Sequence, residues 1–273
     1  MKKILLAFDG EQFSRGAFEF ARRMNDMQPV MLIGVFLPHL DLSVSWTYAT
    51  AGSASSIPLL EKTAGKTVAK NILKFEQECN HYGIKHRVHK YPYDLAIPEL
   101  RKETRFADLL ILGSEKFYEN FGMETPNEYL RMTVQDAECP VVLVPEKFTF
   151  PESIVLSYDG SDDSTHAIRS FTCLFPGLTQ KQAVMVYLAA SENEEMPDKD
   201  YAEELVSSHF SNLSIKVLPR RSGKHLNTWL SELKHPMLVS GSYGRSDLSM
   251  MFRKSFVTQV INDHKLPIFI AHR

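Results

Sequence analysis

The chain has 273 residues, a formal net charge of −2, an apolar content of 44% and a charged content of 23%. These values are typical of a globular protein with room for two domains, and the near-neutral charge excludes electrostatic attraction to nucleic acid or to an anionic membrane. The three cysteines, Cys79, Cys139 and Cys173, include no C-x-x-C pair, so we expect neither a disulfide framework nor a zinc ribbon. No stretch approaches the roughly 18 apolar residues of a membrane span. The short apolar run after Lys3 stops at Asp9, too early for a signal peptide, and we expect a cytoplasmic protein.

In the first half of the chain, short apolar runs alternate with segments of helical spacing. The predicted strands are 3–8, 30–36, 85–91, 108–113 and 141–144, and the predicted helices are 14–24, 60–81, 96–104 and 129–136. The long helix should stop near Gly83, because glycine is favoured just after a helix C-terminus. Residues 38–60 are polar and predict a long loop. Trp46 and Tyr48 in this loop could cover a pocket or lie in a dimer contact.

The second half repeats the same order of elements. Its predicted strands are 153–158, 183–189, 214–218, 237–240 and 268–271, and its predicted helices are 164–175, 199–210, 225–233 and 248–263. Strands that alternate with helices imply parallel βαβ units. We therefore predict an α/β fold of two Rossmann-like domains, 1–147 and 152–273, each a five-stranded parallel sheet with helices on both faces. The linker is short, so the domains should pack closely together.

Direct repetition supports this division. Residues 4–10 read Ile-Leu-Leu-Ala-Phe-Asp-Gly and residues 154–160 read Ile-Val-Leu-Ser-Tyr-Asp-Gly. Asp9 and Asp159 are 150 positions apart, whereas Gly113 and Gly241 are 128 apart, so the first half holds 22 additional residues. The 38–60 loop is the natural place for them, and a loop of that length is usually functional.

The most informative chemistry lies in residues 239–246, which read Val-Ser-Gly-Ser-Tyr-Gly-Arg-Ser. Glycines in such a turn let the backbone approach an anion without a Cβ, and successive N–H groups form an anion-binding nest. A carboxylate at the end of the first strand of the second half shares this sheet edge and could accept a hydrogen bond from a ribose or an adenine amine. The candidate ligand-binding residues are Asp159, Gly241, Ser242, Gly244, Arg245 and Ser255.

Each of these features also has a purely structural interpretation. The two glycines could form the turn that any α/β fold needs between a strand and a helix. Asp9 and Asp159 could be N-caps of the helices that follow them. His86 and His89 face opposite sides of a strand, so we expect no metal site near them.

Three motifs together resemble the universal stress protein family over essentially the whole chain, as a tandem pair. They are Asp159-Gly160-Ser161, Cys139-Pro140-Val141, and Gly241-x-x-Gly244 followed nine residues later by Lys254-Ser255, where the family has Gly-Ser. The resemblance implies domains of the adenine nucleotide alpha hydrolase type. It also implies an ATP site, with Mg²⁺, in the second domain.

The first domain departs from that pattern. Gly113-Ser114-Glu115-Lys116 lacks the second glycine, and Glu115 would repel a phosphate, so we expect ATP in the second domain only. Lys254 replaces a glycine but adds a positive charge. The resemblance further implies that strand 141–144 pairs antiparallel with strand 268–271 inside the chain, giving a pseudo-twofold dimer of domains. A homodimer and an unknown protein partner remain open.

No nucleophile with a base, paired carboxylates or metal cluster is legible in the sequence. We therefore expect a stress-associated, non-catalytic binding or regulatory protein. One alternative is a nucleotide-independent interaction scaffold whose pockets are vestigial. Another is an ATP pyrophosphatase-like enzyme, because residues 159–164 match an S-G-G-x-D-S loop at Gly160, Asp163 and Ser164.

Overall fold

The computed structural model describes residues 1–38, 57–91, 96–119, 128–191, 194–219, 229–230, 232–241 and 266–271. The strands are β1 (Lys2–Phe8), β2 (Val30–Phe36), β3 (Lys85–Lys90), β4 (Leu109–Gly113), β5 (Val141–Val144), β6 (Ser153–Tyr158), β7 (Gln182–Ala189), β8 (Asn212–Pro219), β9 (Pro236–Ser240) and β10 (Ile268–Ile270). The helices are α1 (Arg15–Met27), α3 (Ile57–His81), α4 (Ala96–Thr104), α5 (Glu128–Asp136), α6 (Asp162–Leu174) and α7 (Lys199–His209).

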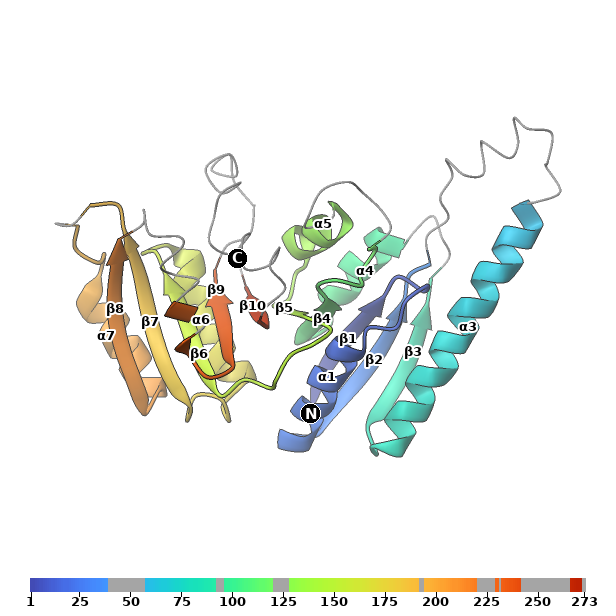
Figure 1. Cartoon of the computed structure of the whole chain (residues 1–273), viewed down its shortest axis with the longest axis horizontal. Helices are drawn as coiled ribbons and strands as arrows, with labels where there is room; N and C mark the ends of the chain where they lie inside the picture. The colour runs from blue at the N-terminus through green and yellow to red at the C-terminus, as the bar shows by residue number, and fades with distance from the viewer. Residues whose placement is uncertain are drawn as a thin grey trace.

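All the strands join one sheet, in the order β3-β2-β1-β4-β5-β10-β9-β6-β7-β8. The pairs within each half are parallel, as between β1 and β4 or β6 and β9. The halves meet at β5 and β10, which pair antiparallel with Ile268 opposite Leu143 and Ile270 opposite Val141. The predicted fold class and the predicted pairing of the last strands within the chain are both confirmed (Figure 1).

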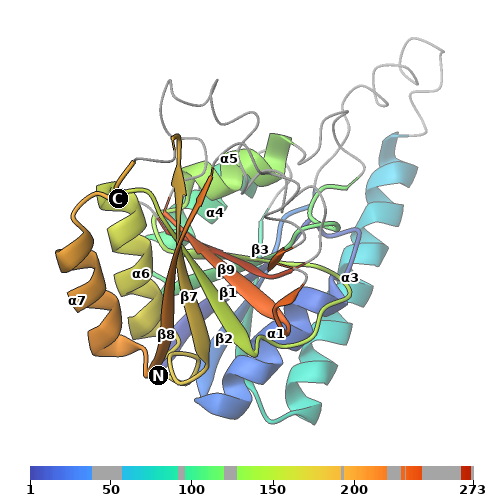
Figure 2. The ribbon, with the colours of Figure 1, turned by 60° about the vertical axis from the view of Figure 1, so that its left-hand side comes forward.

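Helices cover both faces of this sheet. Leu6 of β1 and Leu156 of β6 belong to a buried cluster that includes residues of α1, α3, α6 and α7. The neighbouring Leu5 and Val155 belong to a second cluster, with residues of α4 and α5. Successive strand residues point to opposite faces, so strands buried on both sides are continuous apolar runs. Figure 2 shows the strands of both halves passing together through the middle of the molecule.

The two halves are also joined through side chains next to the linker. The ring of Phe20 in α1 lies 5.3 Å from that of Phe150 and 6.2 Å from that of Phe175, which follows α6. Lys2 Nζ donates to the backbone oxygens of Leu174, at 2.5 Å, and Cys173, at 3.1 Å. The expected close packing of the halves is therefore confirmed.

Serine side chains, not the preceding aspartates, cap the first helix of each half. Ser14 Oγ accepts a hydrogen bond from Ala17 N at 3.2 Å, and Ser161 Oγ accepts one from Ser164 N at 3.1 Å. The interpretation of Asp9 and Asp159 as helix N-caps was therefore wrong. A serine at the N-cap satisfies one of the backbone N–H groups that a helix leaves without an internal partner.

The long helix α3 ends as predicted, at His81, and Gly83 follows it in the left-handed region with φ of 64°. It begins at Ile57, so the last residues of the predicted 38–60 loop are helical. The rest of that loop, with Trp46 and Tyr48, lies outside the described residues, as do the predicted helix 248–263 and most of the predicted helix 225–233. Among the described helices, none has the length and apolar character needed to cross a membrane.

Candidate functional site

The carboxyl end of β1 carries a buried carboxylate. Asp9 is 3% exposed, and its Oδ1 accepts hydrogen bonds from Glu11 N and Gln12 N, both at 2.9 Å. Its Oδ2 accepts from Tyr118 N at 3.2 Å. Burial raises the pKa of Asp9 to about 6, against the opposing effect of these three N–H groups. Both oxygens of Asp9 are thus engaged by the chain itself.

Tyr118 lies against Asp9 and fills the place where open α/β sheets have a crevice outside the strand ends. It lies five residues after β4, is 1% exposed, and its hydroxyl donates to the backbone oxygen of Leu37 at 2.8 Å. Its ring lies 4.8 Å from the rings of Phe117 and Tyr129. Glu115 was the residue that sequence reasoning singled out in this turn. The aromatic pair four and five residues after Gly113 was missed, although it was a signal that this turn is buried.

The equivalent carboxylate of the second half is exposed. Asp159 Oδ1 accepts hydrogen bonds from Ser161 N at 3.0 Å and from Ser161 Oγ at 2.5 Å. Its Oδ2 has no hydrogen-bond partner within the part of the chain that the structure describes. Gly160 turns the chain away from β6 with φ of 82°, a conformation that glycine adopts without steric cost. Asp159 therefore presents one carboxylate oxygen that a ligand could engage.

Gly241, directly after β9, packs against the first turn of α6. A Cβ on this glycine would lie 2.2 Å from the carbonyl carbon of Asp163 and 2.2 Å from Ser164 N. Gly113 occupies the same place at the end of β4, where a Cβ would lie 2.4 Å from Ser14 Oγ. Both glycines are therefore needed for the close approach of a strand end to the start of the first helix of the same half, a packing role that differs from the strand-to-helix turn considered from the sequence.

The structure brings two of the predicted site residues to one place. Gly241 contacts the start of α6, and Asp159 lies three residues before that helix. The remaining candidates lie outside the described residues: Ser242, Gly244, Arg245 and Ser255, together with Lys254.

The N-terminus of α6 is already occupied by its own chain. Ser161 Oγ accepts from Ser164 N, and the first turn carries Asp162 and Asp163. Two carboxylates at this helix end complement its partial positive charge and would repel a second anion. A phosphate at this edge would therefore have to be held by the turn after Gly241 rather than by α6.

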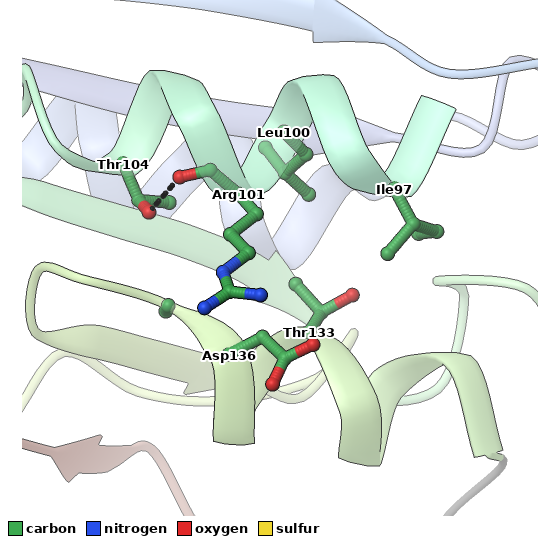
Figure 3. A pocket seen from close by; sticks show the side chains of 7 residues that line it. Ile97, Leu100, Arg101, Thr104, Thr133 and Asp136 are labelled. Carbon is green, nitrogen blue, oxygen red and sulfur yellow. Dashed lines mark hydrogen bonds between the residues drawn. The ribbon is translucent and has the colours of Figure 1, made fainter. Parts of the chain in front are cut away.

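A small hollow between α4 and α5 was not expected from the sequence, and no motif in the sequence indicates it. Its cavity volume is about 10 Å³, about that of one water molecule, and it is lined by Ile97, Leu100, Arg101, Thr104, Thr133, Asp136 and Ala137. Figure 3 shows the Arg101 side chain reaching from α4 toward Thr133 and Asp136 of α5. Thr133 Oγ1 is buried without a hydrogen-bond partner among the described residues. The hollow lies between two helices and does not include Asp159 or Gly241.

The histidines near β3 take part in local contacts. His89 Nδ1 lies 2.8 Å from Glu103 Oε1, which also accepts a hydrogen bond from Tyr91 Oη at 2.5 Å. The ring of His86 packs edge-on against Phe75, with centroids 5.8 Å apart. Within the described ranges, no three His, Cys, Asp or Glu side chains form a group that could hold a metal ion.

Comparison with known proteins gives a fold match but no sequence match. No protein-family model matches the chain, and no curated protein sequence matches it. Among solved structures, the crystal structure of a universal stress protein from Archaeoglobus fulgidus is similar with a TM-score of 0.69 and 15% identity, over 99% of this chain and 98% of that chain. A functionally unknown protein from Pseudomonas aeruginosa is similar with a TM-score of 0.56 and 12% identity, over 100% of this chain and 92% of that one. These likenesses show that the chain has the fold of those structures.

Proposed function

We propose that the protein is a stress-associated, non-catalytic binding or regulatory module with one adenine-nucleotide site, in the second half of the chain. The observation that carries this proposal is the difference between the two equivalent aspartates. Asp9 has both carboxylate oxygens engaged beneath Tyr118, whereas Asp159 is exposed and has one oxygen without a described partner. In sheets of this kind, ligands bind outside the carboxyl ends of the strands, which is where Asp159 lies.

In this proposal the candidate residues have different roles. Asp159 accepts a hydrogen bond from the nucleoside, while Gly244, Arg245 and Ser255 hold ribose and phosphates, with Mg²⁺ bound to the phosphates. Gly241 contributes by setting the strand end against α6 rather than by touching the ligand. The fold likeness to a universal stress protein supports the stress-associated class.

A nucleotide-independent interaction scaffold is the second candidate. The filled crevice of the first half favours it, because a chain that has closed one crevice with its own residues could dispense with nucleotide altogether. An ATP pyrophosphatase-like enzyme is disfavoured by the charge at the start of α6. Asp162 and Asp163 lie in its first turn, and Ser164 Oγ donates to Ser161 O at 2.8 Å instead of pointing at a ligand.

The test is calorimetric titration of nucleotide-stripped protein with ATP and Mg²⁺. We expect saturation at one site per chain, and loss of binding in Gly244→Asp, because a carboxylate in the turn repels phosphate and a Cβ blocks its approach. Lys116→Asp is the matched control, since Lys116 stands 128 positions before Gly244 in the first half. It should bind ATP as the wild type does.

Three other results would contradict the proposal. Unchanged ATP affinity in Gly244→Asp would show that the nucleotide site lies elsewhere. Absence of binding heat at millimolar ATP would favour the nucleotide-independent scaffold. Release of AMP and pyrophosphate during the titration would favour the enzyme. Circular dichroism of both variants checks that they are folded.

A further inference from the structure

The crevice of the first half lies at a position where α/β sheets usually take ligands. The chain runs outward from β1 to β2 and β3, and then crosses back to β4 on the other side of β1. Ligands of open α/β sheets bind outside the carboxyl ends of the strands at such a reversal of strand order. Asp9 after β1, Leu37 after β2 and Tyr118 after β4 meet there.

The Tyr118 side chain makes contacts of the kind that a bound aromatic molecule would make. Its hydroxyl donates to the backbone oxygen of Leu37, and the backbone N–H of Tyr118 donates to Asp9 Oδ2. Its ring lies against Tyr129 at 4.8 Å, with the ring planes tilted by 33°. Aromatic walls with a few placed polar groups are how pockets hold small ligands.

The backbone at this point is strained to achieve that placement. Tyr118 has φ of 55°, in the left-handed region that bulky residues rarely adopt. Such conformations persist only where surrounding contacts over-determine them. The contacts here include a hydrogen bond from the backbone N–H, a hydrogen bond from the side-chain hydroxyl and the ring packing, so the side chain contributes to holding the turn in place.

We propose that the first half contains a binding site for a planar aromatic ring carrying one hydrogen-bond donor, and that Tyr118 occupies this site as an internal ligand. A tethered ring competes at high effective concentration, so a free ligand is excluded while the tyrosine is present. The site accepts a free phenol once the tyrosine side chain is removed. This site is separate from the nucleotide site proposed for the second half and does not depend on it.

The experiment removes the Tyr118 side chain by substitution and adds a small molecule of the same structure. Tyr118→Gly deletes the side chain and suits the left-handed backbone, and the probe is p-cresol, which reproduces that side chain. We expect millimolar p-cresol to raise the melting temperature of Tyr118→Gly by about 3 °C or more, in a saturable manner. Wild type should show no such rise, and neither should Tyr201→Ala, a control at a side chain that is 76% exposed.

Toluene tests the hydrogen bond to Leu37, because it has the ring of p-cresol without the hydroxyl. It should raise the melting temperature of Tyr118→Gly less than p-cresol does. Equal effects of toluene and p-cresol, an equal rise in wild type, or no rise in the variant would each overturn the proposal. If Tyr118→Gly is unfolded alone, the same titration is followed by far-UV circular dichroism. Recovery of the folded signal with p-cresol then supports the site, and no recovery overturns it.

Discussion

Asp9 should give the fold a pH dependence that a single substitution removes. The residue is 3% exposed, and burial raises its pKa from 3.8 to about 6. That change corresponds to about 3 kcal/mol in the free energy of unfolding, at about 1.4 kcal/mol for each pH unit. The hydrogen bonds from Gln12, Glu11 and Tyr118 favour the carboxylate but do not offset the loss of water around it.

The sign of the effect depends on which state holds the proton. The folded-state pKa of Asp9 lies above the unfolded-state value, so the folded protein binds more protons between the two. The stabilisation from protonated Asp9 is therefore complete below about pH 4 and is lost as the pH rises through about 6. Asp9→Asn does not titrate, so the variant should lack this loss of about 3 kcal/mol.

Urea unfolding of wild type and Asp9→Asn across this pH range measures the effect. The free energy of unfolding of the variant minus that of wild type should increase by about 3 kcal/mol between about pH 3 and about pH 8. The difference cancels the other titrating groups and any constant cost of placing an amide beside Tyr118 N. Asp159→Asn is the matched control, because its exposed side chain stays hydrated on folding. If the free energies of unfolding of Asp9→Asn and wild type change with pH in parallel, the reasoning is refuted.

Two further predictions concern packing. Gly241→Ala should lower the free energy of unfolding by about 3 kcal/mol, because its Cβ would lie 2.2 Å from the carbonyl carbon of Asp163. Gly65→Ala is the control, because a Cβ at Gly65 would have no atom within 4 Å apart from its own helix backbone and chain neighbours. Equal urea midpoints for the two variants would contradict the close packing at Gly241. Phe20→Ala should cost about 4 kcal/mol, because this buried ring joins α1 to the second half. The melting temperature of Phe20→Ala is compared with that of Phe106→Ala, in which the replaced ring is 69% exposed. If both variants lower the melting temperature by the same small amount, Phe20 does not hold the halves together.

Local sequence signals determined most of the architecture. Apolar runs bounded by polar turns placed β2 and β5 at their observed ends, because a strand buried on both faces cannot contain a polar residue without an internal partner. The repeated Asp-Gly after the first strand of each half identified two equivalent units. The pairing of β5 with β10 was predicted from the family resemblance and not from the residues themselves, since both strands are simply apolar.

The state of the first crevice could not be predicted in the same way. The missing second glycine and the charge of Glu115 were the sequence features that set the first half apart. In the first half, Tyr118 fills the space through contacts with Asp9 and Leu37, which lie 109 and 81 positions away in the chain. Contacts of that range depend on the finished sheet, and no local pattern encodes them.

Comparing the two halves separates two roles of the Gly-x-x-Gly motif, which are packing of a strand end against a helix and the proposed ligand binding. Its first glycine is present in both halves, as Gly113 and Gly241, and in both it lets a strand end approach the start of the first helix of the same half. Because both glycines make the same packing contact, the first glycine is a requirement of the fold whether or not a ligand binds nearby. Any information about binding must therefore lie in the residues after this glycine, which include Tyr118 in one half and Gly244 in the other. For that reason Gly244→Asp is a cleaner test of nucleotide binding than any substitution of Gly241, which would change the packing of α6 and the site together.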